Sequence, residues 1–117
     1  MSFMKLYKKM KQVRPDERRL VCKTYCNLFT NERCVIGLMV PLPSLKKFYD
    51  SSGFGFAARG LIEEEKTWEL YGPYVERYGL TREEAETLQR LNDSSPVNTW
   101  ERVFKYVEEQ ALKEVPK

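Results

Sequence analysis

Apolar residues recur through the first part of the chain at the spacing of an α-helix, and most of the residues between them are lysines. The apolar positions fall on one side of a helix with 3.6 residues per turn and are Phe3, Leu6, Tyr7, Met10 and Val13. Pro15 disfavours helical backbone in the residue before it. The pattern therefore predicts a basic amphipathic helix over residues 1–14.

From Leu20 the hydrophobic period changes from that of a helix to that of a strand. Alternate positions of one face are Leu20, Cys22, Thr24, Cys26 and Leu28. A polar turn follows, and residues 34–40 are almost continuously apolar. We expect an antiparallel β-hairpin over residues 20–40 with a buried second strand. In the alternative interpretation, the second run is a short strand that passes into a helical turn at Gly37.

Helical periodicity predominates over residues 44–112. Gly72 and Pro73 interrupt one helical segment, and we expect that helix to end there. Thr81 and Glu84 have the T-x-x-E spacing of a capping box, which predicts the start of the next helix.

The last helix has the clearest pattern of the chain. We expect Ser95 to cap it and Pro96 to occupy its first position, where the missing N–H has no cost. Its apolar stripe consists of Val97, Trp100, Phe104, Val107 and Ala111. Together, the elements predict one domain over residues 1–117 of the α+β class. The domain is expected to be mostly helical, with a small antiparallel β-hairpin packed on helices.

The composition weakens the case for several kinds of chemistry. The 117 residues include no histidine, the most frequent general base and metal ligand. We interpret Cys22, Cys26 and Cys34 as buried, reduced thiols, since their number is odd and the chain shows no export signal. A zinc site would need a carboxylate or another chain to complete its ligands. We expect no metal, no cofactor and no catalytic residue.

Neither a membrane span nor a secretory signal stands out. Pro41 and Pro43 interrupt the longest apolar run, which is shorter than the roughly 20 residues of a membrane helix. The first residues lack the apolar stretch of a secretory signal. We therefore expect a cytoplasmic protein with no membrane partner.

The net charge of +3 is distributed unevenly along the chain. Residues 1–23 carry eight basic and two acidic side chains, a net +6, and residues 24–117 carry twelve basic and fifteen acidic ones, a net −3. Such an imbalance is typical of a surface for nucleic acid or an acidic protein, although an exposed helix face can also be basic without a partner. The candidate contact residues in this region are Lys8, Lys9, Lys11, Arg14, Arg18 and Arg19.

Residues 50–60 include three glycines and two phenylalanines. Their spacing matches neither G-x-G-x-x-G nor a P-loop. The phenylalanines could fill the core or, as exposed aromatic side chains on a loop, could anchor a partner. We add Phe54, Phe56 and Arg59 to the candidate contact residues on the second interpretation.

Two segments resemble a group of small proteins of tailed phages and bacteria. Residues 33–41 are similar to the group's Cys-Ala-Val-Gly-x-Leu-Ile-Pro stretch. Residues 88–93, with Pro96 and Trp100 downstream, are similar to its Leu-Gln-x-x-His-Asp signature. This chain has Asn92 where the group usually has histidine, so chemistry that depends on that histidine would be missing. The resemblance implies a phage-related setting, a host-cell location and a small α+β fold, but no reaction.

These features favour a non-enzymatic, phage-type accessory protein. It would bind a host protein with an acidic surface and inhibit or redirect it, for example in a defence or nucleic-acid-processing complex. The alternative is a small nucleic-acid-binding protein that uses the same basic face, with an affinity that falls steeply with salt. A third hypothesis is a small enzyme that uses carboxylates, a tyrosine, or a cysteine activated by a lysine or a helix N-terminus.

Overall fold

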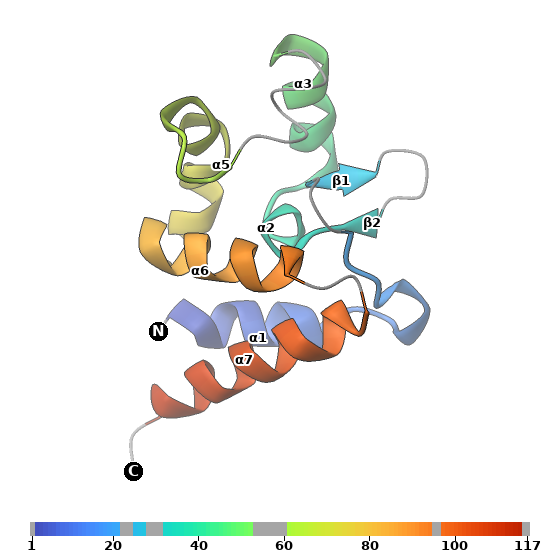
Figure 1. Ribbon diagram of the computed structural model, residues 1–117, viewed down its shortest axis with the longest axis vertical. Helices are drawn as coiled ribbons and strands as arrows, with labels where there is room; N and C mark the ends of the chain where they lie inside the picture. Colours follow the sequence, from blue (N-terminus) through green and yellow to red (C-terminus); the bar gives the residue numbers. More distant parts are fainter. Residues whose placement is uncertain (1, 22–24, 28–31, 53–60, 95–96, 116–117) are drawn as a thin grey trace.

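Figure 1 shows the computed structural model of the chain, which describes residues 2–21, 25–27, 32–52, 61–94 and 97–115. The helical elements are α1 (Ser2–Gln12), the 3₁₀ helix η1 (Pro15–Glu17), α2 (Val35–Leu38), α3 (Leu42–Ser52), α5 (Glu65–Arg77), α6 (Arg82–Asp93) and α7 (Thr99–Lys113). The strands are β1 (Cys26–Asn27) and β2 (Glu32–Arg33), which pair antiparallel with Cys26 opposite Arg33.

The α+β class was wrong: the described part of the chain is predominantly helical, as expected, but its two strands have only two residues each and form no β-layer. The expected hairpin over residues 20–40 is reduced to a pairing of two residues with two. The predicted second strand is instead helix α2. An apolar run of this length suits a helix that is buried on all sides as well as it suits a buried strand, so its period could not distinguish them.

Contacts from outside the segment help to hold α2 in its helical form. Cys34 is the N-cap, and its Sγ accepts a hydrogen bond from the backbone N–H of Gly37 at 3.3 Å. The N–H of Val35 donates to Oδ1 of Asn92 on α6 at 2.9 Å, and Nδ2 of Asn92 donates to the carbonyl of Val21 at 2.8 Å. Asn92 is fully buried and joins three segments of the chain.

Helix α1 confirms the predicted amphipathic helix, although it ends at Gln12. It buries Phe3, Leu6 and Met10 and lies beside α7, with the two helices running in opposite directions (Figure 1). The N–H of Phe3 donates to Glu114 at 2.9 Å, and the Tyr7 hydroxyl donates to Oε2 of Glu108 at 2.8 Å. This bond to Glu108 is the main reason that the pKa of Tyr7 is raised.

The predicted break at Gly72 and Pro73 was wrong, because α5 runs through both residues. Pro73 is exposed, so water can reach the carbonyl that the proline leaves without an intrahelical partner.

The capping box at the start of α6 is confirmed. The N–H of Glu84 donates to Oγ1 of Thr81 at 3.2 Å, and the N–H of Thr81 donates to Oε1 of Glu84 at 2.9 Å.

Helix α7 begins later than expected. Its N-cap is Asn98, which adopts the left-handed conformation at φ 54°, and Val97 is 66% exposed instead of belonging to the buried stripe. Val103 takes the place in the core that the sequence pattern gave to Phe104, which is only half-buried. Ser95 and Pro96 lie outside the described residues.

None of the helices in the described ranges combines the length and the hydrophobicity that crossing a bilayer requires. The predicted burial of the thiols is confirmed for Cys34, while the side chains of Cys22 and Cys26 lie outside the described residues.

Candidate functional site

Lysines cover the outer face of α1. Because Leu6 and Met10 face the core, Lys8, Lys9 and Lys11 are exposed on the other sides of the helix. Within the part of the chain that the structure describes, Lys8 and Lys9 form no ion pair. Their charges are therefore available to a partner, whereas an ion pair within the fold would have to be broken first.

The segment between α1 and β1 carries the three candidate arginines. Arg14 lies 3.8 Å from Asp16 in an exposed ion pair, and Arg19 lies 3.6 Å from Glu32 with its own side chain 78% exposed. Exposed pairs of this kind contribute only about 0–1 kcal/mol. The exposed guanidinium group of Arg19 can therefore turn to a partner's carboxylate at little cost.

Two contacts within the fold hold the side chain of Arg18. Its Nε donates to the carbonyl of Val13 at 3.3 Å, and its guanidinium carbon lies 6.0 Å from the centroid of the Trp100 ring. The two terminal nitrogens of Arg18 have no partner among the described residues. Trp100 therefore orients a guanidinium group that still has free hydrogen-bond donors.

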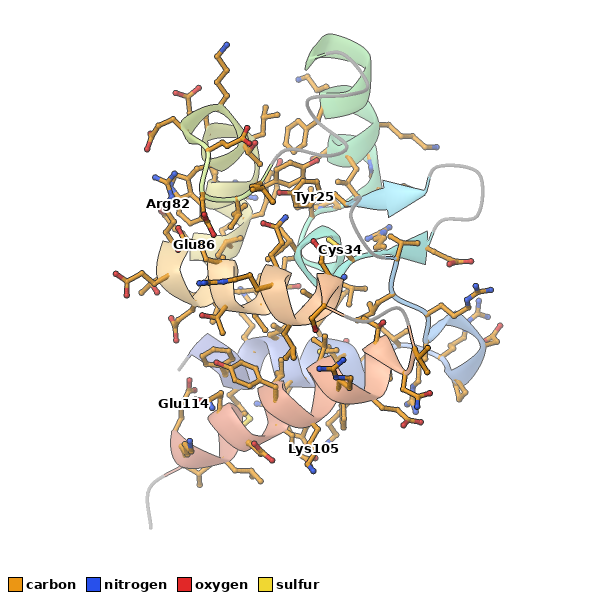
Figure 2. All side chains as sticks on the ribbon, in the orientation of Figure 1. Tyr25, Cys34, Arg82, Glu86, Lys105 and Glu114 are labelled. Carbon is orange, nitrogen blue, oxygen red and sulfur yellow. The ribbon has the colours of Figure 1, made fainter. Side chains whose placement is uncertain are left out.

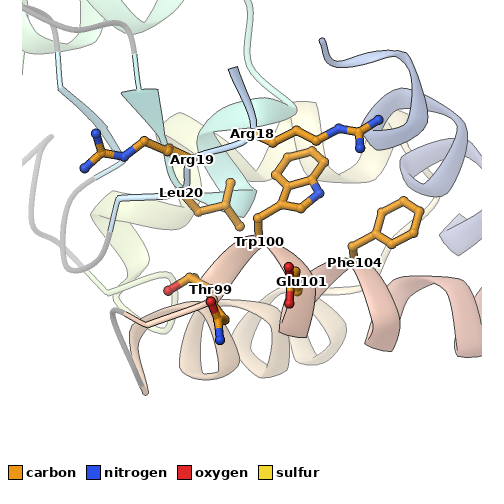
Figure 3. A pocket seen from close by; sticks show the side chains of 8 residues that line it. Arg18, Arg19, Leu20, Thr99, Trp100, Glu101 and Phe104 are labelled. Atoms are coloured by element: carbon orange, nitrogen blue, oxygen red, sulfur yellow. The ribbon is translucent and has the colours of Figure 1, made fainter. Parts of the chain in front are cut away.

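A pocket of about 570 Å³ separates this segment from the start of α7 (Figure 3). In the figure the side chain of Arg18 runs across the indole of Trp100, and the side chain of Arg19 extends in the opposite direction. The pocket thus has basic groups on two sides, with both apolar and polar side chains between them. The residues that line it are Arg18, Arg19, Leu20, Asn98, Thr99, Trp100, Glu101 and Phe104.

A row of three aromatic rings with a cation at each end connects the pocket to α1. The Trp100 ring stacks on Phe104 with 6.3 Å between centroids, and Phe104 lies 5.5 Å from the ring of Tyr7. The Lys11 Nζ lies 5.0 Å from the Tyr7 ring. We call Lys11, Tyr7, Phe104, Trp100 and Arg18 the cation–aromatic row. It links Lys11 on α1 to Arg18 at the pocket.

The structure therefore brings Arg18 and Arg19 to one pocket and links Arg18 to Lys11. The sequence interpretation did not assign Trp100 and Phe104 to this surface, because it placed both in a buried stripe. The only local signal was their separation by four residues, which puts them on one side of a helix. Phe54, Phe56 and Arg59 lie outside the described residues.

The polar residues of the interior serve the fold. Tyr25 is buried and stacks on Tyr71 at 4.0 Å, and its hydroxyl accepts a hydrogen bond from Nε2 of Gln89 at 2.8 Å. Burial is the largest of the effects that raise the pKa of Tyr25, and neighbouring Cys34 adds to it. Figure 2 places Tyr25 and Cys34 in the interior of the upper half. In the described ranges, no three Cys, Asp or Glu side chains gather as a metal site would require.

Comparisons of the chain with protein families, with curated proteins and with solved structures found no match.

Proposed function

We propose that the protein is a non-enzymatic binding protein whose basic face docks onto an acidic surface of another protein. The face consists of Lys8, Lys9, Lys11, Arg14, Arg18 and Arg19. In the setting that the sequence resemblance implies, the partner is a protein of the host cytoplasm, which the chain inhibits or redirects. The observation that carries the proposal is the cation–aromatic row, because it links Lys11 of α1 to Arg18 of the following segment.

The electrostatics of this face support a role in association. Opposite charges on two proteins accelerate their encounter and fix their relative orientation more than they raise affinity. The lysine charges act over a Debye length of about 8 Å at physiological salt. Aromatic side chains and arginines are also the residue types that contribute most at protein interfaces. The half-buried Phe104 and Tyr7 supply aromatic surface between the charges.

Nucleic-acid binding is the second candidate, and the cation–aromatic row is again the relevant observation. Single-stranded nucleic acids bind to basic grooves in which bases stack on aromatic rings. Trp100, however, is only 9% exposed and has Arg18 across its ring, which leaves little ring surface for a base. Glu101 also lines the pocket, and a nucleic-acid strand, which carries a charge at every nucleotide, could not keep its phosphates away from this carboxylate as a protein surface can. An acidic protein surface therefore fits better.

Affinity capture from a bacterial lysate tests the proposal. The baits are the wild-type chain, the variant K8E/K9E/K11E and the matched variant K46E/K47E/K66E. The matched variant reverses three exposed lysines on α3 and α5 and therefore changes the net charge equally. Each capture is repeated with nuclease and at raised salt.

We expect acidic proteins that the wild-type and matched baits retain and the α1 variant loses, with or without nuclease. Raised salt should weaken this retention, because exposed charges are screened. Equal retention by all three baits would show that the basic face is not the docking surface. Loss of every captured protein on nuclease treatment would favour the nucleic-acid candidate instead.

A further inference from the structure

A hollow with a defined lining lies between residues 18–20 and the start of α7. A surface that attracts a partner by charge alone would not need such a hollow. Its volume of about 570 Å³ lies within the range of about 300–1,000 Å³ that is typical of ligand pockets. Leu20, Trp100 and Phe104 give it apolar and aromatic lining, and Val97, directly before Asn98 in the chain, is 66% exposed. An occupant that presents only charge would leave this apolar area unused.

The placement of the two arginines limits the shape of an occupant. Arg18 and Arg19 extend in opposite directions in Figure 3, so one compact anion could not engage both directly. Arg18 keeps two terminal nitrogens without a partner in the described part of the chain, and Arg19 has only a loose contact with Glu32 at 3.6 Å. Both can form charge-assisted hydrogen bonds with carboxylates. An extended segment with acids at two points matches this arrangement.

The acidic residues of the pocket argue for a peptide over a nucleic-acid strand. Glu101 lines the pocket, and Glu32 lies beside Arg19. A strand of nucleic acid carries a charge at every nucleotide and would have to bring phosphates close to both glutamates. A peptide can direct its carboxylates to the arginines and keep uncharged groups near Glu32 and Glu101.

We infer that the pocket binds an extended peptide segment of the partner in which an apolar side chain stands between two acidic residues. The apolar side chain packs against the half-buried Phe104, next to Trp100, and the carboxylates pair with Arg18 and Arg19. This inference rests on the proposed function and specifies what the basic face recognises. The lysines of α1 then attract the acidic surface around the segment, and the pocket determines the sequence that fits.

Selection from a random-peptide library tests the inference without an identified partner. Peptides are selected on the wild-type chain and counter-selected on R18Q/R19Q, with K46Q/K47Q on α3 as the matched variant. Enriched peptides are then titrated into a W68F protein, in which Trp100 is the sole tryptophan and reports on the pocket. Circular dichroism of each variant establishes that it is folded. An oligothymidylate of equal charge is titrated in parallel.

We expect enriched peptides with an apolar residue between two acids and a saturable change in Trp100 fluorescence. R18Q/R19Q should weaken their binding by at least tenfold, whereas K46Q/K47Q should not change it. The inference is overturned if no acidic–apolar pattern is enriched, if R18Q/R19Q binds such peptides equally, or if the oligothymidylate binds more tightly than they do.

The lysine variant separates this inference from the proposed function. If K8E/K9E/K11E abolishes capture of a protein from lysate but R18Q/R19Q does not, the basic face is the docking surface and the peptide pocket is refuted. If neither variant affects capture, both proposals are refuted.

Discussion

Single atoms at a few positions decide the path of the chain. A Cβ atom added to Gly37 would lie 2.1 Å from the backbone carbonyl oxygen of Tyr25. Helix α2 can therefore approach the Tyr25 backbone only because this position has no side chain. The N–H of Cys34 also donates to the Tyr25 carbonyl at 3.0 Å, so the same backbone group fixes the start of the helix. This contact was not predictable from a run of apolar residues.

The substitution Gly37→Ala should destabilise the protein by about 3 kcal/mol, the upper part of the usual range for overpacking, because a backbone group cannot move aside. Gly72→Ala is the matched control within another helix. There the added Cβ would lie 2.7 Å from the Trp68 ring, which is a side chain and can shift. Urea denaturation of both variants should show a much smaller loss of unfolding free energy for Gly72→Ala than for Gly37→Ala. Equal losses of unfolding free energy would contradict this account.

At the scale of the elements, predictability depended on whether the signal was local. Helix α6 was predicted by its capping box, and α1 was predicted by its apolar stripe and lysines. Helix α2 was foreseen only as a helical turn at Gly37 in the alternative interpretation, because most of the contacts that support it, apart from its Cys34 cap, come from elsewhere in the chain. Those contacts include Asn92 at the end of α6, which the sequence interpretation noted only as the replacement for a histidine.

Tyr25 links the β1 segment to α5 and α6 through Tyr71 and Gln89, and this link depends on pH. The pKa of Tyr25 is raised above its ordinary value of 10.0 in the folded protein, mainly by burial. Folding therefore favours the neutral phenol. The contribution of neutral Tyr25 to the stability of the fold is complete below pH 10. It is lost as the pH rises from there towards the raised pKa of Tyr25 in the folded protein.

The variant Tyr25→Phe should be less stable than the wild type at pH 8, because it leaves Nε2 of Gln89 without its partner. Between pH 8 and pH 11 the difference in free energy of unfolding between the wild type and the variant should shrink by about 1.4 kcal/mol. This amount follows from the ionisation of Tyr25 in the unfolded wild-type chain. Urea denaturation at the two pH values measures this change. A difference that stays constant would show that Tyr25 is not held neutral by the fold.

For the whole molecule, the sequence predicted the uneven charge but not the surface that the charge forms. Arg18 and Arg19 were candidates because the first 23 residues carry a net +6. Their pocket depends on the packing of α1 against α7, which brings distant parts of the chain together. No local pattern links Arg18 to Trp100, so the aromatic half of the surface could be recognised only in three dimensions.

The central claim is that the lysine face of α1 is covered when the partner is bound. Lysine acetylation footprinting tests it most directly, on the free chain and on its complex with a captured protein. Lys8, Lys9 and Lys11 should lose reactivity in the complex, while the exposed Lys46, Lys47 and Lys66 should keep theirs. Unchanged reactivity of the α1 lysines, with protection on α3 or α5 instead, would contradict the claim.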